Sequence, residues 1–376
     1  MGAVTDSLAS KRIAVCVGSG GVGKTTVAAA LALQRALDGG RALVCTIDPA
    51  RRLANALGLE NLGNAEARVP EHRFAAAGLA PRGELWAMML DVKRTWDDLV
   101  ARHAPDRTRR ERILRNRIYQ QLSGALAGSQ EYMAMEKLYE LATERDYDLV
   151  VLDTPPTSHA LDFLEAPDRI LDFLGNEAAR RLLTPALSAG RLGLRIAHLG
   201  GSYIAKTLAR FTGGEVLQEL SEFLGVFDGM YEGFQSRAAA VRSLLADPRL
   251  GFVIVAGPNP LSVDEALLLH ETLHAESMPI AGAVVNRASS SLLSPGAAPP
   301  SPEALAAALT AAGESFEPSF PARLARAVAD NELLATADQR QTERLFREVE
   351  AAHSVVPRFE GNVHDLDGLA RLARRI

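Results

Sequence analysis

Short, uninterrupted runs of apolar residues recur along the chain, and segments long enough for helices separate them. A continuous run is typical of a strand that is covered on both faces, as in a parallel sheet with crossover helices. Seven runs have this character: 12–18 (RIAVCVG), 41–47 (RALVCTI), 85–91 (LWAMMLD), 148–153 (DLVVLD), 251–257 (GFVIVAG), 281–286 (AGAVVN) and 353–359 (HSVVPRF). We therefore predict an α/β fold built on a doubly wound, mostly parallel sheet.

The segments between these runs are mostly helical in character. Residues 25–40 (TTVAAALALQRALDGG) are rich in Ala and Leu and finish on two glycines, which predicts a helix and its end. No strand-like run lies between Asp153 and Gly251, and apolar residues recur there at helical spacing. We predict one domain over residues 1–376, with a helical insertion subdomain over residues 160–248.

Two shorter segments have a distinct composition. Residues 289–303 (SSSLLSPGAAPPSPE) are rich in Ser, Pro and Ala, which predicts a loop. Residues 102–117 (RHAPDRTRRERILRNR) are rich in arginine but also contain acidic residues and lack aromatic ones. A solvated helical face accounts for this pattern better than a nucleic-acid site does.

The bulk composition narrows the class of protein further. The chain has 376 residues, 47% of them hydrophobic, and a formal net charge of −5, so a general nucleic-acid binder is not expected. Its two cysteines, Cys16 and Cys45, lie inside apolar runs and form no C-x-x-C pair, which supports neither a disulfide framework nor a cysteine zinc site. The first residues lack the apolar core of a signal peptide, and no run reaches the ~18 apolar residues of a membrane span, so we expect a cytoplasmic protein.

Residues 18–26 (GSGGVGKTT) carry the strongest chemical signal in the sequence. They match G-x-x-x-x-G-K-[ST] between a predicted strand and a predicted helix, which is the context of a phosphate-binding P-loop. Lys24 is expected to neutralise the β- and γ-phosphates of ATP or ADP, and the Thr25 hydroxyl to bind Mg²⁺. The residues expected around the nucleotide are Gly20, Gly21, Val22, Gly23, Lys24, Thr25 and Thr26. The simpler alternative is a glycine-rich turn without a ligand.

Two aspartates follow predicted strands at the edge where α/β sheets bind ligands. Asp153 ends DLVVLD and could hold the shell of a magnesium ion. Asp48 directly follows the run 41–47, before PARRLANAL, and could polarise an attacking water. Asp48 could equally be the N-cap of the next helix, with Pro49 at its first position.

Four segments in order, GSGGVGKTT, TIDPARRLANALG, DTPPTSHALDFLEAP and AVVN, resemble the arsenical-pump ATPase (ArsA) family. That family includes the tail-anchored-protein targeting ATPase of eukaryotes, and this sequence is most similar to its bacterial branch, whose client is unassigned. The resemblance implies a P-loop ATPase that works as a homodimer or as a heterodimer with a paralogue. It also implies that Asp48 positions water, that Asp153 lies beside Mg²⁺ and that Asn286 reads adenine. Taken alone, Asn286 is better explained as the end of a strand in a turn.

The sequence also departs from the family. The arsenite-binding cysteines and the zinc-binding C-x-x-C of its branches have no counterparts here, so we expect neither arsenite nor zinc to bind. Ser19 stands where the family has a lysine that reaches the partner's phosphates. Arg51 and Arg52 are candidates to replace that charge in catalysis, the alternative being that both lie on a solvated helix face.

The sequence is compatible with two functions. One is an ATP-driven switch whose insertion handles a hydrophobic or membrane-protein client, although the apolar residues of the insertion could simply form its own core. The other is a membrane-positioning or partitioning ATPase of the MinD or ParA type. Its feature would be residues 365–376 (DLDGLARLARRI), whose apolar and basic residues could contact a membrane peripherally or pack on the domain itself.

Overall fold

The protein is described by a computed structural model, which defines residues 2–48, 52–117, 119–120, 123, 129–154, 231–294, 296–361 and 363–376. Its centre is an eight-stranded sheet in the order β3-β4-β2-β5-β1-β6-β7-β8. The strands are β1 (Ile13–Val17), β2 (Arg41–Thr46), β3 (Ala67–Arg68), β4 (Glu84–Met89), β5 (Leu149–Asp153), β6 (Leu250–Ala256), β7 (Ile280–Ala288) and β8 (Ala352–Pro357). Only β3 runs antiparallel to its neighbour. All seven predicted strands and the predicted α/β class are therefore confirmed.

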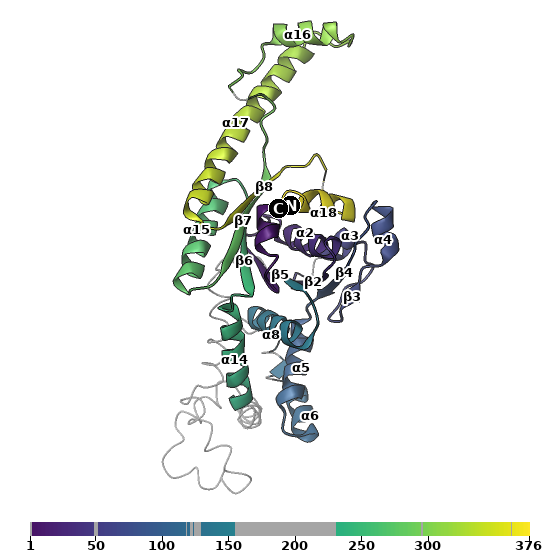
Figure 1. Ribbon diagram of the computed structural model, residues 1–376, viewed down its shortest axis with the longest axis vertical. Coiled ribbons are helices and arrows are strands. Elements are labelled where there is room, and N and C mark those ends of the chain that lie inside the picture. Colours follow the sequence, from purple (N-terminus) through teal and green to yellow (C-terminus); the bar gives the residue numbers. More distant parts are fainter. Residues whose placement is uncertain are drawn as a thin grey trace, which may run out of the picture.

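Helices cover both faces of the sheet (Figure 1). On one face lie α1 (Ala3–Ser7), α2 (Lys24–Leu37), α3 (Arg52–Leu57), α4 (Glu71–Ala76) and α18 (Leu366–Ala373). On the other lie α5 (Val92–His103), α6 (Arg107–Arg115), α8 (Ser129–Glu144), α14 (Tyr231–Leu245), α15 (Pro260–Ala275) and α17 (Phe320–Glu348). Alternate residues of one strand enter the two cores, since Cys16 faces α2 whereas Val15 and Val17 face the opposite layer. This double coverage is why the strands are apolar without interruption.

Helices extend beyond the sheet in two opposite directions (Figure 1). The 29-residue helix α17 carries α16 (Pro302–Ala311) at its far end, away from α5, α6 and α14 (Figure 1). The loop predicted over 289–303 ends where α16 begins at Pro302, and its described residues up to that point lie in no helix or strand. Most of the predicted insertion, residues 160–230, lies outside the described residues, and the part within them includes α14.

The C-terminal segment packs on its own domain. Leu366, Leu369, Leu372 and Ile376 are all buried in the core that α18 shares with α2. Its arginines stay at the surface, where Arg371 pairs with Asp367. Of the two alternatives for residues 365–376, the structure has the packed one, in which these four apolar side chains face the core and not the surface. No helix among the described residues is long and apolar enough to span a bilayer.

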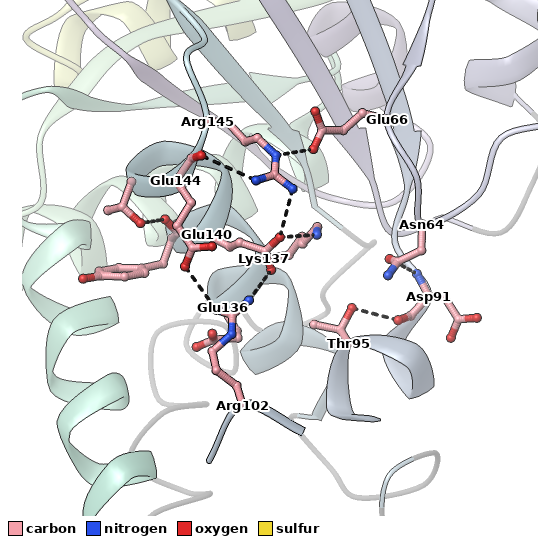
Figure 2. A network of polar contacts seen from close by, with 12 residues as sticks. Asn64, Glu66, Asp91, Thr95, Arg102, Glu136, Lys137, Glu140, Glu144 and Arg145 are labelled. Carbon is pink, nitrogen blue, oxygen red and sulfur yellow. Dashed lines mark hydrogen bonds and ion pairs between the residues drawn. The ribbon is translucent and has the colours of Figure 1, made fainter. Parts of the chain in front are cut away.

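Ion pairs fix α8, the helix that leads into β5 (Figure 2). Arg102 of α5 pairs with Glu140 and Glu144 at 3.3 and 3.2 Å. Glu136, which is 2% exposed, accepts from Arg237 of α14 at 2.8 Å. Burial raises the pKa of the Glu136 carboxyl, and the Arg237 charge opposes that rise. Helix α8 is therefore held by α5 and by α14 before the chain enters the strand that ends at Asp153.

The Arg-rich stretch 102–117 is a solvated surface in the structure. Asp106 caps α6 by accepting from the backbone N–H of Arg109, and Arg107 pairs with Glu111 along the same helix. Ile113 is the buried residue of α6. Arg102, Arg107 and Arg109 thus have acidic partners within the chain, which fits the solvated face expected from the sequence.

Candidate functional site

The candidate site lies where β1, β2 and β5 end side by side. Asp153, the last residue of β5, is in register with Cys16 of β1 and with Thr46 of β2. The chain leaves β1 directly into the loop 18–23 and then into α2. Parallel strands thereby bring the glycine-rich loop, the end of β2 and the carboxylate of β5 to one edge of the sheet.

The loop has a backbone that only glycine can adopt easily at several positions. Gly21 and Gly23 have φ angles of 78° and 96°, and a Cβ on Gly18 would lie 2.0 Å from the carbonyl oxygen of Val255. The backbone N–H groups of residues 20–26 donate to no acceptor among the described residues. A row of free N–H groups that opens a helix forms a concave site for phosphate.

Lys24 lies folded over this loop. Its ammonium group donates to the carbonyl oxygens of Gly18 and Ser19 at 2.8 and 2.9 Å, and the residue is only 6% exposed. Burial lowers the pKa of the Lys24 amine, and the charge of Asp153 opposes this. A cation held among phosphate-binding N–H groups is suited to an anionic ligand.

Asp153 is the best-defined polar group of the site. Its Oδ2 accepts from the hydroxyls of Thr25 and Thr46 at 2.6 and 2.7 Å, whereas its buried Oδ1 has no hydrogen-bond partner. Burial raises the pKa of the carboxyl to about 6, although the two threonine hydrogen bonds lower it. A buried carboxylate oxygen without a partner, beside a threonine hydroxyl, fits Mg²⁺, which prefers oxygen ligands. The pair Thr25 and Asp153 predicted as magnesium ligands thus lies in direct contact.

Asp48 lies next to this group. Its backbone N–H donates to the Thr46 hydroxyl at 3.2 Å, and its carboxylate is 4.0 Å from the guanidinium of Arg52. Arg52 opens α3, and its side chain is 72% exposed. Residues 49–51, and with them the candidate Arg51 and the predicted cap at Pro49, lie outside the described residues.

Asn286 contacts the loop directly. Its side-chain amide donates to the carbonyl oxygen of Val22 at 2.8 Å, and the residue is 4% exposed. A Cβ on Gly23 would lie 2.3 Å from that amide nitrogen, which is a second reason for glycine there. Asn286 lies inside β7 and is opposite Val356 of β8. It does not end a strand in a turn, so that simpler alternative is wrong. Next to it, Arg287 donates to the carbonyl oxygen of Gly21 at 3.3 Å.

This geometry agrees with the comparison to protein families. Residues 11–291 match the family model of the ArsA, or anion-transporting, ATPases. The chain belongs to this family. The matched range includes the loop, Asp153 and Asn286, so the ArsA-family match covers every described part of the site.

Individual proteins similar to this chain include two that are named as ATPases. An uncharacterised protein of Streptomyces coelicolor is 30% identical over 258 residues, which is 67% of this chain and 56% of that protein. ATPase ARSA2 of Chlamydomonas reinhardtii is 27% identical over 72% of this chain and 66% of its own length. ATPase get3 of Aspergillus terreus is 30% identical over 40% of this chain and 41% of its own length. The chain therefore spans only about two fifths to two thirds of the length of these relatives.

Ser19, where the ArsA-family resemblance places a lysine, is engaged within its own chain. Its hydroxyl oxygen is 3.0 Å from that of Ser262 on α15, and Ser262 also accepts from the buried backbone N–H of Gly257. The start of the loop is thereby tied to the turn between β6 and α15. Uncharged and short, Ser19 provides no charge for a partner.

Three residues of the site were not identified from the sequence. Thr46 lies at the end of a strand, two residues before Asp48, and a hydroxyl at that position could have indicated a polar residue of the site. Arg287 and Ser262 gave no local signal, because their contacts with the loop join residues more than 240 positions apart.

Neither cysteine is suited to bind a metal. Both are free and buried, Cys16 on the α2 side of the sheet and Cys45 on the other. Burial raises the pKa of the Cys45 thiol to about 12 and that of Cys16 further, so neither is a thiolate at neutral pH. Within the described residues, no three His, Cys, Asp or Glu side chains form a group that could hold a metal.

Proposed function

We propose that this protein is a magnesium-dependent ATPase that switches conformation between its ATP and ADP states. The observation that carries the proposal is the Asp153 carboxylate, whose one oxygen is held by a hydroxyl from the loop and a hydroxyl from β2 while the other has no partner. A shared carboxylate of this kind joins the loop to the segment that carries Asp48. A change at the phosphates can therefore reach the segment after β2.

We assign a separate role in nucleotide binding and hydrolysis to each residue of the site. The N–H groups of residues 20–26 bind the phosphate chain, and Lys24 neutralises its charge. Thr25 and Asp153 would hold Mg²⁺, which supplies positive charge to the phosphate oxygens during transfer. Asp48 orients and polarises the attacking water. The side-chain oxygen of Asn286, whose amide is already committed to Val22, accepts from the adenine amino group.

Hydrolysis needs a further cation, because Ser19 contributes none. We place it at Arg52 or Arg51, at the start of α3. The 4.0 Å pair of Arg52 with Asp48 supports this, since the guanidinium already lies beside the water-positioning carboxylate. Arginine's planar fork suits phosphate oxygens.

The proposed switch is a cytoplasmic dimer, either of two copies or of this chain with a paralogue. In this proposal a second subunit closes over the phosphates at the edge of the sheet where the loop lies. The client we propose is a hydrophobic protein segment. Arsenite and zinc have no place in the proposal, since the cysteines are separate and buried.

The proposal is tested by measuring phosphate release from ATP by the full chain, with Mg²⁺ and with Mg²⁺ removed by a chelator. Hydrolysis that requires Mg²⁺ is expected. Sedimentation in ATP and in ADP then tests the switch, with the larger species expected in ATP. Absence of Mg²⁺-dependent phosphate release at every protein concentration would overturn the proposed activity, and one sedimentation coefficient in both nucleotides would overturn the dimeric switch.

A further inference from the structure

Arg287 occupies an irregular position at the end of β7. In the pairing of β7 with β8, Asn286 lies opposite Val356 and Ala288 opposite Pro357, so Arg287 is the residue that the ladder skips. Its φ angle is 64°, in the left-handed region that residues with a Cβ rarely adopt. β-bulges next to functional sites often redirect a side chain, and left-handed residues persist where their surroundings demand them.

The bulge directs two neighbouring side chains onto the loop. The guanidinium of Arg287 donates to the carbonyl oxygen of Gly21 at 3.3 Å, and the amide of Asn286 donates to that of Val22 at 2.8 Å. Two successive carbonyl groups of the loop are thereby held toward the end of β7. Lys24 holds the carbonyls of Gly18 and Ser19 in the same manner.

Peptide planarity converts these contacts into an orientation for the opposite groups. In a trans peptide unit the C=O and the following N–H point in opposite directions. When Arg287 fixes the carbonyl of Gly21, the N–H of Val22 is turned away from β7, and Asn286 does the same for the N–H of Gly23. Neither of these N–H groups donates to an acceptor among the described residues, so both remain for a ligand.

We propose that Arg287 is a positioning residue that aims the loop's N–H groups at the phosphate chain of the nucleotide. The inference rests on the proposed function, because it assumes that phosphate binds in the loop. It assigns Arg287 no contact with the base. Its effect is therefore on phosphate affinity, whatever is attached to the phosphates.

The test uses Arg287→Gly, which removes the guanidinium but adopts the left-handed backbone without strain. Affinities for Mg-ATP and for inorganic tripolyphosphate are measured by competition against a fluorescent ATP analogue. We expect both to weaken by about tenfold, the effect of losing one charge-assisted hydrogen bond. The melting temperature without ligand is expected to stay level or rise, because the strained backbone is relieved.

Two further variants complete the test. Arg287→Lys keeps a cation that can donate to Gly21 and should recover most of the affinity. Ser277→Gly is the matched control, since Ser277 is the other described non-glycine residue with a left-handed φ, at 55°, and lies beyond α15. It should change the melting temperature as Arg287→Gly does and leave both affinities unchanged.

The outcomes separate the two proposals. Failure of the wild type to bind either ligand overturns the proposed function and this inference with it. Normal binding by the wild type together with unchanged affinities in Arg287→Gly overturns the inference alone. A loss confined to ATP also overturns it, because that result would place Arg287 on the adenosine moiety. Loss of stability and affinity together, without recovery in Arg287→Lys, would show a role in folding only.

Discussion

The hydroxyl oxygens of Ser19 and Ser262 lie 3.0 Å apart and join the first turn of the phosphate loop to the start of α15. Ser262 is 5% exposed, and its hydroxyl also accepts from the N–H of Gly257 at the end of β6. The position that carries a mobile charge in the family resemblance is here part of a contact within one chain. The loop therefore has a fixed anchor in place of a lysine.

The two serines are expected to contribute unequally to stability. Ser262→Ala leaves the buried N–H of Gly257 without an acceptor, which should lower the free energy of unfolding by about 1–3 kcal/mol. Ser19→Ala removes a half-buried hydroxyl and leaves Ser262 able to serve Gly257, so its cost should be below about 1 kcal/mol. Urea denaturation of both variants measures this. Equal losses would show that the Ser19 contact matters as much as the buried one.

The buried Asp153 carboxylate should make the metal-free protein less stable at high pH. Its native pKa of about 6 lies above the ordinary value of 3.8, so the native state binds a proton more readily than the unfolded chain. Stability therefore falls as pH rises from about 4 to about 6, and the cost, at most on the order of 3 kcal/mol, persists above that window.

Asp153→Asn provides the measurement. Without metal, the variant should be more stable than the wild type at pH 8, and the difference should shrink as pH falls through about 6 toward 4. With Mg²⁺ and ADP the order should reverse, because only the wild type keeps the carboxylate that would hold the ion. Thermal unfolding across pH, with and without Mg-ADP, tests both parts. A variant that Mg-ADP stabilises as strongly as it does the wild type would contradict the assignment of Asp153.

Asp48 should affect hydrolysis more than binding. Asp48→Asn keeps the size of the side chain and removes the charge that polarises water, so the turnover number should fall by about 10²-fold or more. Affinity for ATP should remain within a few fold of the wild type, as measured by calorimetry. Turnover at the wild-type rate would reduce Asp48 to a structural residue at the end of β2.

Arg52 can be tested against a closely matched pair elsewhere on the surface. Arg52 and Asp48, and likewise Arg326 and Asp330, are four positions apart with charged atoms 4.0 Å from each other. Arg52→Ala should lower the hydrolysis rate at least about tenfold with ATP affinity kept, if it replaces part of what arginine fingers supply. Arg326→Ala should leave the rate unchanged. If Arg52→Ala, Arg51→Ala and the double variant all match the control, the activating cation lies elsewhere.

The sequence was most informative where local pattern and tertiary burial coincide. The strands β1, β2 and β5 are covered on both faces, so each is an uninterrupted apolar run that is visible in the sequence alone. The short strand β3 could not be predicted, because its two residues, Ala67 and Arg68, form no pattern and depend on β4 for pairing. The packing of α18 could not be predicted for a different reason, because an amphipathic helix does not reveal which surface it covers.

The residues of the site also differ in whether local sequence or the fold reveals them. The loop, Asp48 and Asp153 follow strands directly, so chain order alone places them at one edge of the sheet. The anchors of the loop, Ser262, Asn286 and Arg287, come from β7 and α15, and their spacing from the loop is set by the sheet order β1-β6-β7. Asn286 was found in the sequence only through a family resemblance. Its bond to Val22 became visible only with the fold.

The central claim is that the glycine-rich loop binds nucleotide through its phosphates, and Lys24→Ala tests it most directly. Lys11→Ala is the control, because Lys11 also donates its ammonium group to a backbone carbonyl, that of Pro248, but lies outside the loop. Calorimetric titration with Mg-ATP and Mg-ADP should show a loss of about 10²-fold or more in Lys24→Ala and none in Lys11→Ala. Mg-ATP affinity in Lys24→Ala equal to that of the wild type would contradict the account.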